Sequence, residues 1–289
     1  SLGLEQEPGD NLWGGQLSVQ YELDPRSMVY ALLARGYKAG GVNGEAIGKA
    51  RKSGLDPSII AFLGTRSEFD AETLWNYELG WKFASADDRL RLRTALFWME
   101  RNDVQLKAWY NEGPQFVGYT DNAASGSNYG LELEADWLAV EGLRLDASLG
   151  LLDTEIGNFV ANDPELGFVD KDGREQAQAP NWQFRLGAEL ALFAHGFARV
   201  EYEGKDGYYL SDSDDARSDA YRLLHLAAGY RGERVEATAW LRNALDEDYV
   251  VHGFYFGNDP RKFYANEAWY QYGAPRVAGV TVSWTTALR

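Results

Sequence analysis

Cysteine is absent from this chain of 289 residues, and histidine occurs only three times. The lack of cysteine excludes a disulfide framework, a thiolate metal site and a cysteine nucleophile. Long apolar runs are also missing, because no segment approaches the roughly 18 residues that a transmembrane helix requires. Any crossing of a membrane must therefore use β-strands.

Basic residues are scarce, with 28 Lys and Arg against 44 Asp and Glu, so the formal net charge is −16. Binding to phosphates requires clustered basic side chains, and we therefore expect no nucleic-acid partner. The chain begins at Ser1 without the basic start and apolar stretch of a signal peptide. This beginning predicts that the sequence is a piece of a longer protein.

Apolar and aromatic side chains are plentiful. Hydrophobic residues make up 45% of the chain and aromatic residues 14%, with 10 Trp and 17 Tyr. Trp and Tyr combine an apolar body with a polar edge, so they gather where apolar and wet surroundings meet. The composition therefore indicates a protein with an extensive interface rather than a disordered chain.

The dominant pattern is alternation with a period of two. From Tyr129 to Trp137 the odd positions are apolar or aromatic, and the even positions are Gly, Glu or Asp. Leu143 to Leu151 repeats the pattern after the short link 139–142. Each segment predicts a strand with one dry and one wet face, and the pair predicts a hairpin. Even residues 130–136 should share a face with even residues 144–150.

Similar segments recur along the chain and are separated alternately by short turns and by longer connections. The long connections are rich in Gly, Asp, Asn and Pro and span residues 39–70, 157–179, 209–217 and 252–271. We predict about eleven strands, at residues 12–23, 27–38, 71–84, 89–110, 115–138, 143–156, 181–192, 196–209, 218–231, 234–251 and 272–286.

Alternating short and long connections are typical of bacterial outer-membrane barrels. The predicted fold class is therefore all-β: a transmembrane, antiparallel, up-and-down β-barrel with neighbours paired in sequence order and no helix longer than a few turns. Such barrels normally have an even number of strands. Since the first and last predicted strands run in the same direction, we expect an odd number of further strands upstream of residue 12.

Two other classes fit part of the pattern. A soluble carbohydrate-binding β-sandwich would also be aromatic, acidic and rich in Gly, and a passive porin-like channel would share the strand pattern. The sandwich explains poorly why the wet face carries both signs of charge, as in Arg91, Arg93, Glu132 and Glu134, opposite a face of Trp, Leu and Phe. A membrane wall around a wet or plugged lumen explains that partition better.

Several short blocks, in order and spread over most of the chain, resemble the TonB-dependent outer-membrane receptors. They are ARGYKAGGVN at 34–43, ETLWNYELG at 72–80, NAA at 122–124, YGLELE at 129–134, LGLLDT at 149–154, APNW at 179–182, LRNALDEDY at 241–249 and GAPR at 273–276. Each block is short, and their shared order and spacing give the resemblance its weight.

The resemblance implies that residues 1–289 are the C-terminal half of a 22-stranded barrel in a Gram-negative outer membrane. A plug domain and further strands would precede them, and the plug would contact the TonB complex. The implied function is TonB-coupled uptake of a scarce nutrient such as a ferric siderophore, without enzymatic chemistry or a cofactor. The last strand also resembles the signal for the barrel-assembly machinery, carried by Gly279, Val282 and Trp284.

Ligand contacts are predicted in the last long connection, which concentrates aromatic side chains beside two cations. Stacking and charge-assisted hydrogen bonds could hold a planar or anionic ligand there, although an interfacial aromatic belt would look similar. The predicted residues are His252, Phe254, Tyr255, Phe256, Arg261, Lys262, Tyr264, Trp269 and Tyr270.

Other polar groups give weaker signals. His195 falls in a predicted short turn and His225 in a strand, without a Ser partner that would indicate a hydrolase. Asp212, Asp214 and Asp215 could hold calcium, but such acids are more often merely solvated, and we predict no metal site. Further along the wall, the set Glu132, Glu134, Arg144 and Asp146 could contact a plug or pair with one another.

Overall fold

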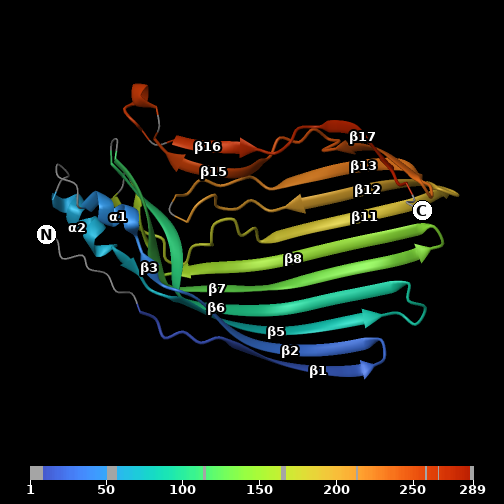
Figure 1. The fold of residues 1–289 in the computed structure, drawn as a ribbon, viewed down its shortest axis with the longest axis horizontal. Helices are drawn as coiled ribbons and strands as arrows, with labels where there is room; N and C mark the ends of the chain where they lie inside the picture. The colour runs from blue at the N-terminus through green and yellow to red at the C-terminus, as the bar shows by residue number, and fades with distance from the viewer. Residues whose placement is uncertain are drawn as a thin grey trace.

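Eleven antiparallel strands form one curved sheet in which every strand pairs with its neighbours in chain order (Figure 1). The computed structural model describes residues 9–50, 57–112, 115–163, 167–212, 214–257, 259–265 and 267–286. The strands of the sheet are β1 (Gly15–Asp24), β2 (Ser27–Lys38), β5 (Glu72–Ala84), β6 (Leu90–Glu112), β7 (Gln115–Val140), β8 (Leu143–Gly157), β11 (Trp182–Phe193), β12 (Gly196–Lys205), β13 (Tyr221–Arg231), β14 (Val235–Arg242) and β17 (Val277–Trp284). The predicted sequential meander is confirmed.

The register places alternate residues on opposite faces, as predicted. Glu134 of β7 lies opposite Ser148 of β8, and Leu133 lies opposite Leu149. Directly paired residues share a face, so the even residues of both strands form one surface and the odd residues form the other. The hairpin prediction for residues 129–151 is therefore correct in both pairing and register.

The two faces of the sheet differ in polarity over its whole width. On the apolar face, one row crosses the sheet through Leu33, Tyr77, Trp98 and Tyr129, all of them exposed. On the polar face, a row runs through Lys82, Arg93, Glu134, Ser148 and Arg185. The polar and apolar faces predicted from the sequence are therefore continuous surfaces of the sheet.

The two ends of the sheet also differ. Short turns join β1 to β2, β5 to β6, β7 to β8, β11 to β12 and β13 to β14 at one end, on the right of Figure 1. Long connections occupy the other end, at residues 39–71, 158–181, 206–220 and 243–276. Strands β6 and β7 are much longer than their neighbours and project into this second end, which we call the long-connection end.

The connection 39–71 contains two short helices that the sequence did not predict. Helices α1 (Gly44–Ala50) and α2 (Pro57–Thr65) lie between the two-residue strands β3 (Gly41–Val42) and β4 (Glu68–Phe69), which pair with each other. Pro57 opens α2 at a position where its missing N–H costs nothing. No helix in the described ranges is long and apolar enough to cross a membrane.

The helices are held by a small core at the projecting part of β6 and β7. Ala46 of α1 and Leu63 of α2 are fully buried against Ala108, Val117 and Tyr119. The ring of Phe62 meets Tyr119 edge-on, with the ring centroids 5.7 Å apart. The connection is therefore a packed cap on the strands, and its helices depend on this contact rather than on their own length.

Three asparagines fasten the irregular segments to the strands. The buried Asn43 donates from Nδ2 to the carbonyl oxygens of Arg66 and Thr120, and the N–H of Thr120 donates to its Oδ1. Asn122 donates to the carbonyl oxygens of Asp70 and Asp103, and the N–H of Asp70 donates back. Each side chain thereby satisfies backbone groups that no ladder reaches.

The third asparagine, Asn243, corrects one predicted strand. The prediction of a single strand over 234–251 is wrong, because β14 ends at Arg242 and Asn243 turns the chain with a φ of 48°. Its side chain donates to the carbonyl oxygens of Glu247 and Ala274 and accepts from the N–H of Glu247. This side chain therefore closes both ends of the connection that follows.

That connection is itself a hairpin, whereas the sequence analysis predicted no strand within residues 252–271. Strands β15 (Val250–Phe256) and β16 (Glu267–Tyr272) pair with each other, and the 3-10 helix η1 (Pro260–Lys262) lies at their tip. Tyr272 belongs to β16, so the last strand of the sheet begins at Val277 and not at residue 272. A smaller hairpin, β9 (Val160–Asp163) with β10 (Gly167–Asp170), interrupts the connection 158–181.

On the polar face, aromatic rings lie over glycines of the adjacent strand. The pairs are Tyr30 over Gly80, Phe97 over Gly130, Phe197 over Gly229 and Trp240 over Gly279. A ring that covers a glycine protects its bare backbone from water and fixes the register. Gly279, predicted as part of an assembly signal, thus also has a packing reason to be glycine.

Replacing Gly130 by Ala in the full-length protein should destabilise the sheet. A Cβ at this position would meet the carbonyl oxygen of Leu151 at 2.2 Å and the ring of Phe97 at 2.7 Å. We expect a loss of roughly 1–3 kcal/mol in unfolding free energy, measured by urea titration in detergent. Gly36, on the same face with nothing within 4 Å of its Cβ position, is the matched control. Equal effects of G130A and G36A would refute the packing explanation.

The chain 1–289 on its own should not form a stable closed barrel. Among the described strands, β1 pairs only with β2 and β17 only with β14, and all ten residues of β1 are exposed. These edges leave unpaired N–H and C=O groups, which are costly in lipid or detergent. We expect the isolated chain to show no heat-dependent shift in gel migration. A clear shift, with cooperative refolding, would contradict this expectation.

Candidate functional site

The nine predicted ligand residues all belong to the β15–β16 hairpin and its tip, but the hairpin divides them between two faces. His252 and Phe254 share one face with Trp269, and the His252 and Phe254 rings meet edge-on at 6.2 Å. Tyr255 and Tyr270 lie on the opposite face. Phe256 ends β15, and its side chain lies outside the described residues.

The two predicted cations are both occupied by carboxylates of the same hairpin. Arg261 donates to Asp259 from Nε at 3.0 Å and from its terminal nitrogen at 2.8 Å, while Lys262 pairs with Glu267. The hydrogen bonds from Arg261 lower the pKa of Asp259, and the bond to Glu267 raises the pKa of Lys262. The basic part of the tip is therefore internally neutralised.

Phe263 is the most prominent side chain of the tip, and the sequence analysis did not select it. It is 91% exposed. Phe263 and Tyr264 both have positive φ, 54° and 59°, a backbone region that L residues seldom occupy. Its only signal in the sequence is its membership of the aromatic window 252–271.

The hairpin is anchored to the neighbouring connection. The hydroxyl of Tyr208 donates to the carbonyl oxygen of Val251 at 3.1 Å. A Cβ on Gly253 would meet Cδ1 of Leu210 at 2.6 Å, so the side chain of Leu210 packs directly against the backbone of the hairpin at this point. Together with the clamp at Asn243, these contacts fix the base of the hairpin and leave its tip exposed.

A buried arginine joins the connections 158–181 and 206–220. Arg174 donates to the carbonyl oxygens of Ser211 at 2.9 Å and Asp212 at 3.0 Å, and its guanidinium lies 4.0 Å from the centre of the Tyr209 ring. Arg217 lies 4.2 Å from the same ring. Burial lowers the pKa of Arg174. These contacts make the two connections one packed unit.

The acids considered for calcium are used inside this unit. Asp215 accepts a hydrogen bond of 2.9 Å from Lys171, which lowers its pKa. Asp212 accepts from the N–H of Ala177, and Asp214 accepts from that of Ala216. In the described part of the chain, these carboxylates do not converge as ligands for one ion. Their chemistry is that of turn capping and ion pairing.

The polar face carries an ion-pair network across several strands. Arg199 of β12 donates to both oxygens of Asp146 on β8, at 2.9 and 3.1 Å, and to Glu201 at 3.2 Å, while Arg185 of β11 pairs with Glu201. Arg199 can reach over β11 because Gly187 lies between them, where a Cβ would come within 2.3 Å of the Asp146 carboxylate.

Three of the four predicted wall charges, Glu134, Arg144 and Asp146, pair with charged residues outside the predicted set. Arg144 donates to Asp136 at 2.7 Å, and Arg93 donates to Glu134 at 2.9 Å. Glu132 borders a hollow of about 530 Å³ on this face, together with Glu134, Gln183, Arg185, Glu203 and Lys205. The wall charges are therefore paired, but with Arg93, Asp136 and Arg199 and not with one another as considered from the sequence.

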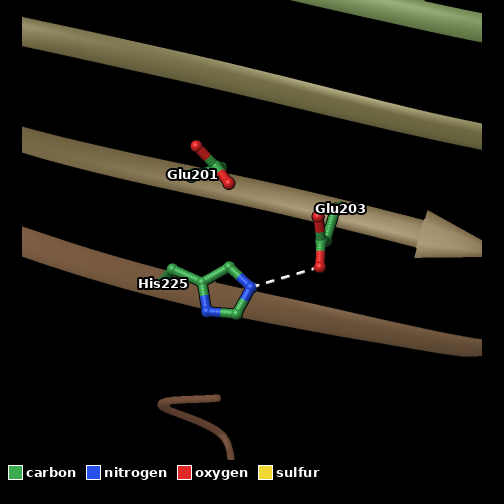
Figure 2. Close-up of side chains that lie close together, drawn as sticks. All are labelled: Glu201, Glu203 and His225. Atoms are coloured by element: carbon green, nitrogen blue, oxygen red, sulfur yellow. Dashed lines mark hydrogen bonds and ion pairs between the residues drawn. The ribbon is translucent and has the colours of Figure 1, made fainter. Parts of the chain in front are cut away.

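Glu201, Glu203 and His225 form a compact group on this wall, with ligand atoms within 4.8 Å of one another (Figure 2). The N–H of Asn243 donates to Nδ1 of His225 at 3.1 Å, so the neutral ring carries its proton on Nε2, which lies 3.3 Å from Glu203. A metal at Nε2 would require that proton on Nδ1, where it would have no acceptor.

Glu201 is also unsuited to ligation because Arg185 and Arg199 already bind it. The group therefore fits a hydrogen-bonded link between the wall and the Asn243 turn better than a metal site. The third histidine, His195, lies in the short turn between β11 and β12, where its ring meets Tyr230 at 5.3 Å. His225 and His195 thus both have packing or hydrogen-bonding roles.

Comparison with known proteins identifies relatives of this chain in sequence and in fold. The pesticin receptor of Yersinia pestis is 28% identical over 264 residues, which cover 89% of this chain and 35% of the receptor. The crystal structure of the ferric yersiniabactin uptake receptor FyuA from Yersinia pestis superimposes with a TM-score of 0.69 at 24% identity, covering 94% of this chain and 37% of that one. The copper transporter OprC gives a TM-score of 0.69 at 19% identity, covering 94% and 39%.

This chain spans about a third of the length of the curated relatives that it matches. These relatives are receptors and transporters by name, and the solved structures share the fold of this sheet. The sequence profile of the TonB-dependent receptor-like β-barrel family matches residues 5–244. The chain therefore belongs to this family of Gram-negative outer-membrane β-barrels.

Proposed function

We propose that residues 1–289 are the C-terminal part of the barrel of a TonB-coupled importer, and that its cargo is a ferric siderophore. The observation that carries the proposal is the family match over 5–244 on a sheet whose long connections all gather at one end. Proteins named for ferric yersiniabactin and for siderophores in general are among its structural relatives. In this proposal the long-connection end faces outward and the short turns face the periplasm.

The apolar face would contact the hydrocarbon of the bilayer. Along β7, Tyr129 and Trp137 are exposed on this face and are separated by about 27 Å of strand at about 3.4 Å per residue. With a tilt of about 40°, this length projects to about 20 Å, which is close to the apolar band of about 25 Å in such barrels. The two aromatics would therefore lie near opposite interfaces.

The polar face would line the lumen and meet a plug supplied by another part of the protein. Its charges are largely paired, so the wall presents a fixed polar surface rather than mobile ions. The barrel-assembly machinery would recognise the last strand, where Val282 and Trp284 are exposed on the apolar face.

Ligand capture would use the long-connection end. The cap on β6 and β7 and the unit around Arg174 are internally packed, whereas the β15–β16 hairpin holds an exposed aromatic tip above an anchored base. We therefore assign the first ligand contacts to aromatic side chains of this hairpin. Aromatic faces contribute to the binding free energy by stacking as well as by burial of apolar surface.

Cells that carry the full-length receptor should take up ferric siderophore only when TonB is present. We expect accumulation of radioactive iron from a chelate panel in the intact strain and background levels in a strain without TonB, because transport against a gradient needs energy coupling. Surface binding should survive the loss of TonB. Equal uptake in both strains would favour a passive channel and refute the proposal.

A further inference from the structure

We propose that the long-connection end selects uncharged or cationic ferric chelates and disfavours anionic ones, with the exposed aromatic tip of the β15–β16 hairpin as its contact. The inference rests on the proposed function, because it names the class of chelate that the same outer surface would take. It replaces the earlier expectation that Arg261 and Lys262 attract an anionic ligand.

The first observation is that the basic side chains of the connections 158–181, 206–220 and 243–276 are already matched with carboxylates. The pairs are Arg261 with Asp259, Lys262 with Glu267, Arg276 with Asp246, Lys171 and Arg174 with Asp215, and Arg217 with Glu175. An arriving anion would have to displace an attached carboxylate, whose effective concentration is high because it belongs to the same fold.

The second observation is an excess of acid in these three connections. Residues 206–220 contain five Asp and one basic residue, and residues 158–181 contain five acidic and two basic residues. Residues 243–276 contain five acidic and three basic residues. A surface with this balance produces a negative potential that repels anions and concentrates cations, over about 10 Å at ordinary ionic strength.

The third observation is the chemistry of the hairpin tip. Its charges cancel in two local pairs, and its most exposed large apolar side chain is the phenyl ring of Phe263, which is 91% exposed. Phe263 and Tyr264 keep a positive φ in spite of its conformational cost, and residues in this region often cluster at ligand-binding sites. Such a tip can stack on a planar, uncharged surface without attracting negative charge.

The test uses the purified full-length receptor in detergent and two probes of similar size. One is an uncharged ferric tris-hydroxamate, and the other is a strongly anionic ferric tris-catecholate. Binding is followed by quenching of tryptophan fluorescence at low and high salt. We expect the uncharged probe to bind at least about tenfold more tightly at low salt, with little salt dependence. Binding of the anionic probe should improve as salt screens the repulsion.

Paired substitutions separate charge from stacking. D259N with E267Q would release both cations and should strengthen binding of the tris-catecholate several-fold at low salt. R261A with K262A should leave the affinity for the tris-hydroxamate unchanged. F263A should weaken tris-hydroxamate binding by about 3-fold to 10-fold, which corresponds to the loss of one stacked ring. F193A is the control, since Phe193 is an exposed phenyl ring at the short-turn end.

Tighter binding of the tris-catecholate, weakened by salt, would overturn the inference, and so would loss of tris-hydroxamate binding in the R261A and K262A variant. Failure of both probes to bind while cells still show TonB-dependent iron uptake would overturn it and leave the proposed function standing. Failure of both probes together with absent uptake would refute the proposed function as well.

Discussion

Backbone hydrogen bonds between strands that follow one another in the chain hold this sheet together, and its other features depend on them. Side chains alternate strictly in such a ladder, so a single register gives one face to Trp, Tyr and Leu and the other to charged and small residues. The same ladder lets short turns stay at one end, while every long connection is forced to the opposite end. The polar wall and the outer surface are thus products of one pairing scheme.

The blocks that resemble the family have a physical explanation in the asparagines they contain. Asn43 and Asn243 each follow the end of a strand, and Asn122 lies within β7 beside the interruption of the β6 ladder at Asp103. Each supplies donors and an acceptor to backbone groups without ladder partners. Asn181, in the APNW block, donates to Glu175 in the connection that precedes β11. An amide side chain can both give and accept hydrogen bonds, which a carboxylate or an amine cannot do alone.

Much of the sheet could be predicted from the sequence because alternation is a local property. The run from Tyr129 to Trp137 shows its two faces without reference to any partner, and its pairing with residues 143–151 follows from a short link. Helices α1 and α2 could not be predicted in this way. Each is very short, and each is held by burial of Ala46 or Leu63 against strands distant in sequence.

The candidate site was predicted less completely, for the same reason. Composition located the aromatic segment 252–271, but its division into two faces depends on the hairpin register, and the break at Asn243 depends on one left-handed residue. The ion pairs of Arg261 and Lys262 could not be predicted either, because sequence spacing does not show which carboxylate each cation contacts. Charge counts predict a field, whereas recognition depends on which charges remain unpaired.

The gap at Gly187 has a mechanical consequence for the wall. Because β11 has no side chain at that position, the guanidinium of Arg199 ties β12 directly to Asp146 of β8, over the strand that separates them. Sliding of β11 against either neighbour would carry a bulkier residue, Arg185 or Glu189, into the space that this tie occupies. The shear between these strands is therefore fixed by a side-chain bridge in addition to the ladder, and this part of the wall should resist deformation when force is applied to the lumen.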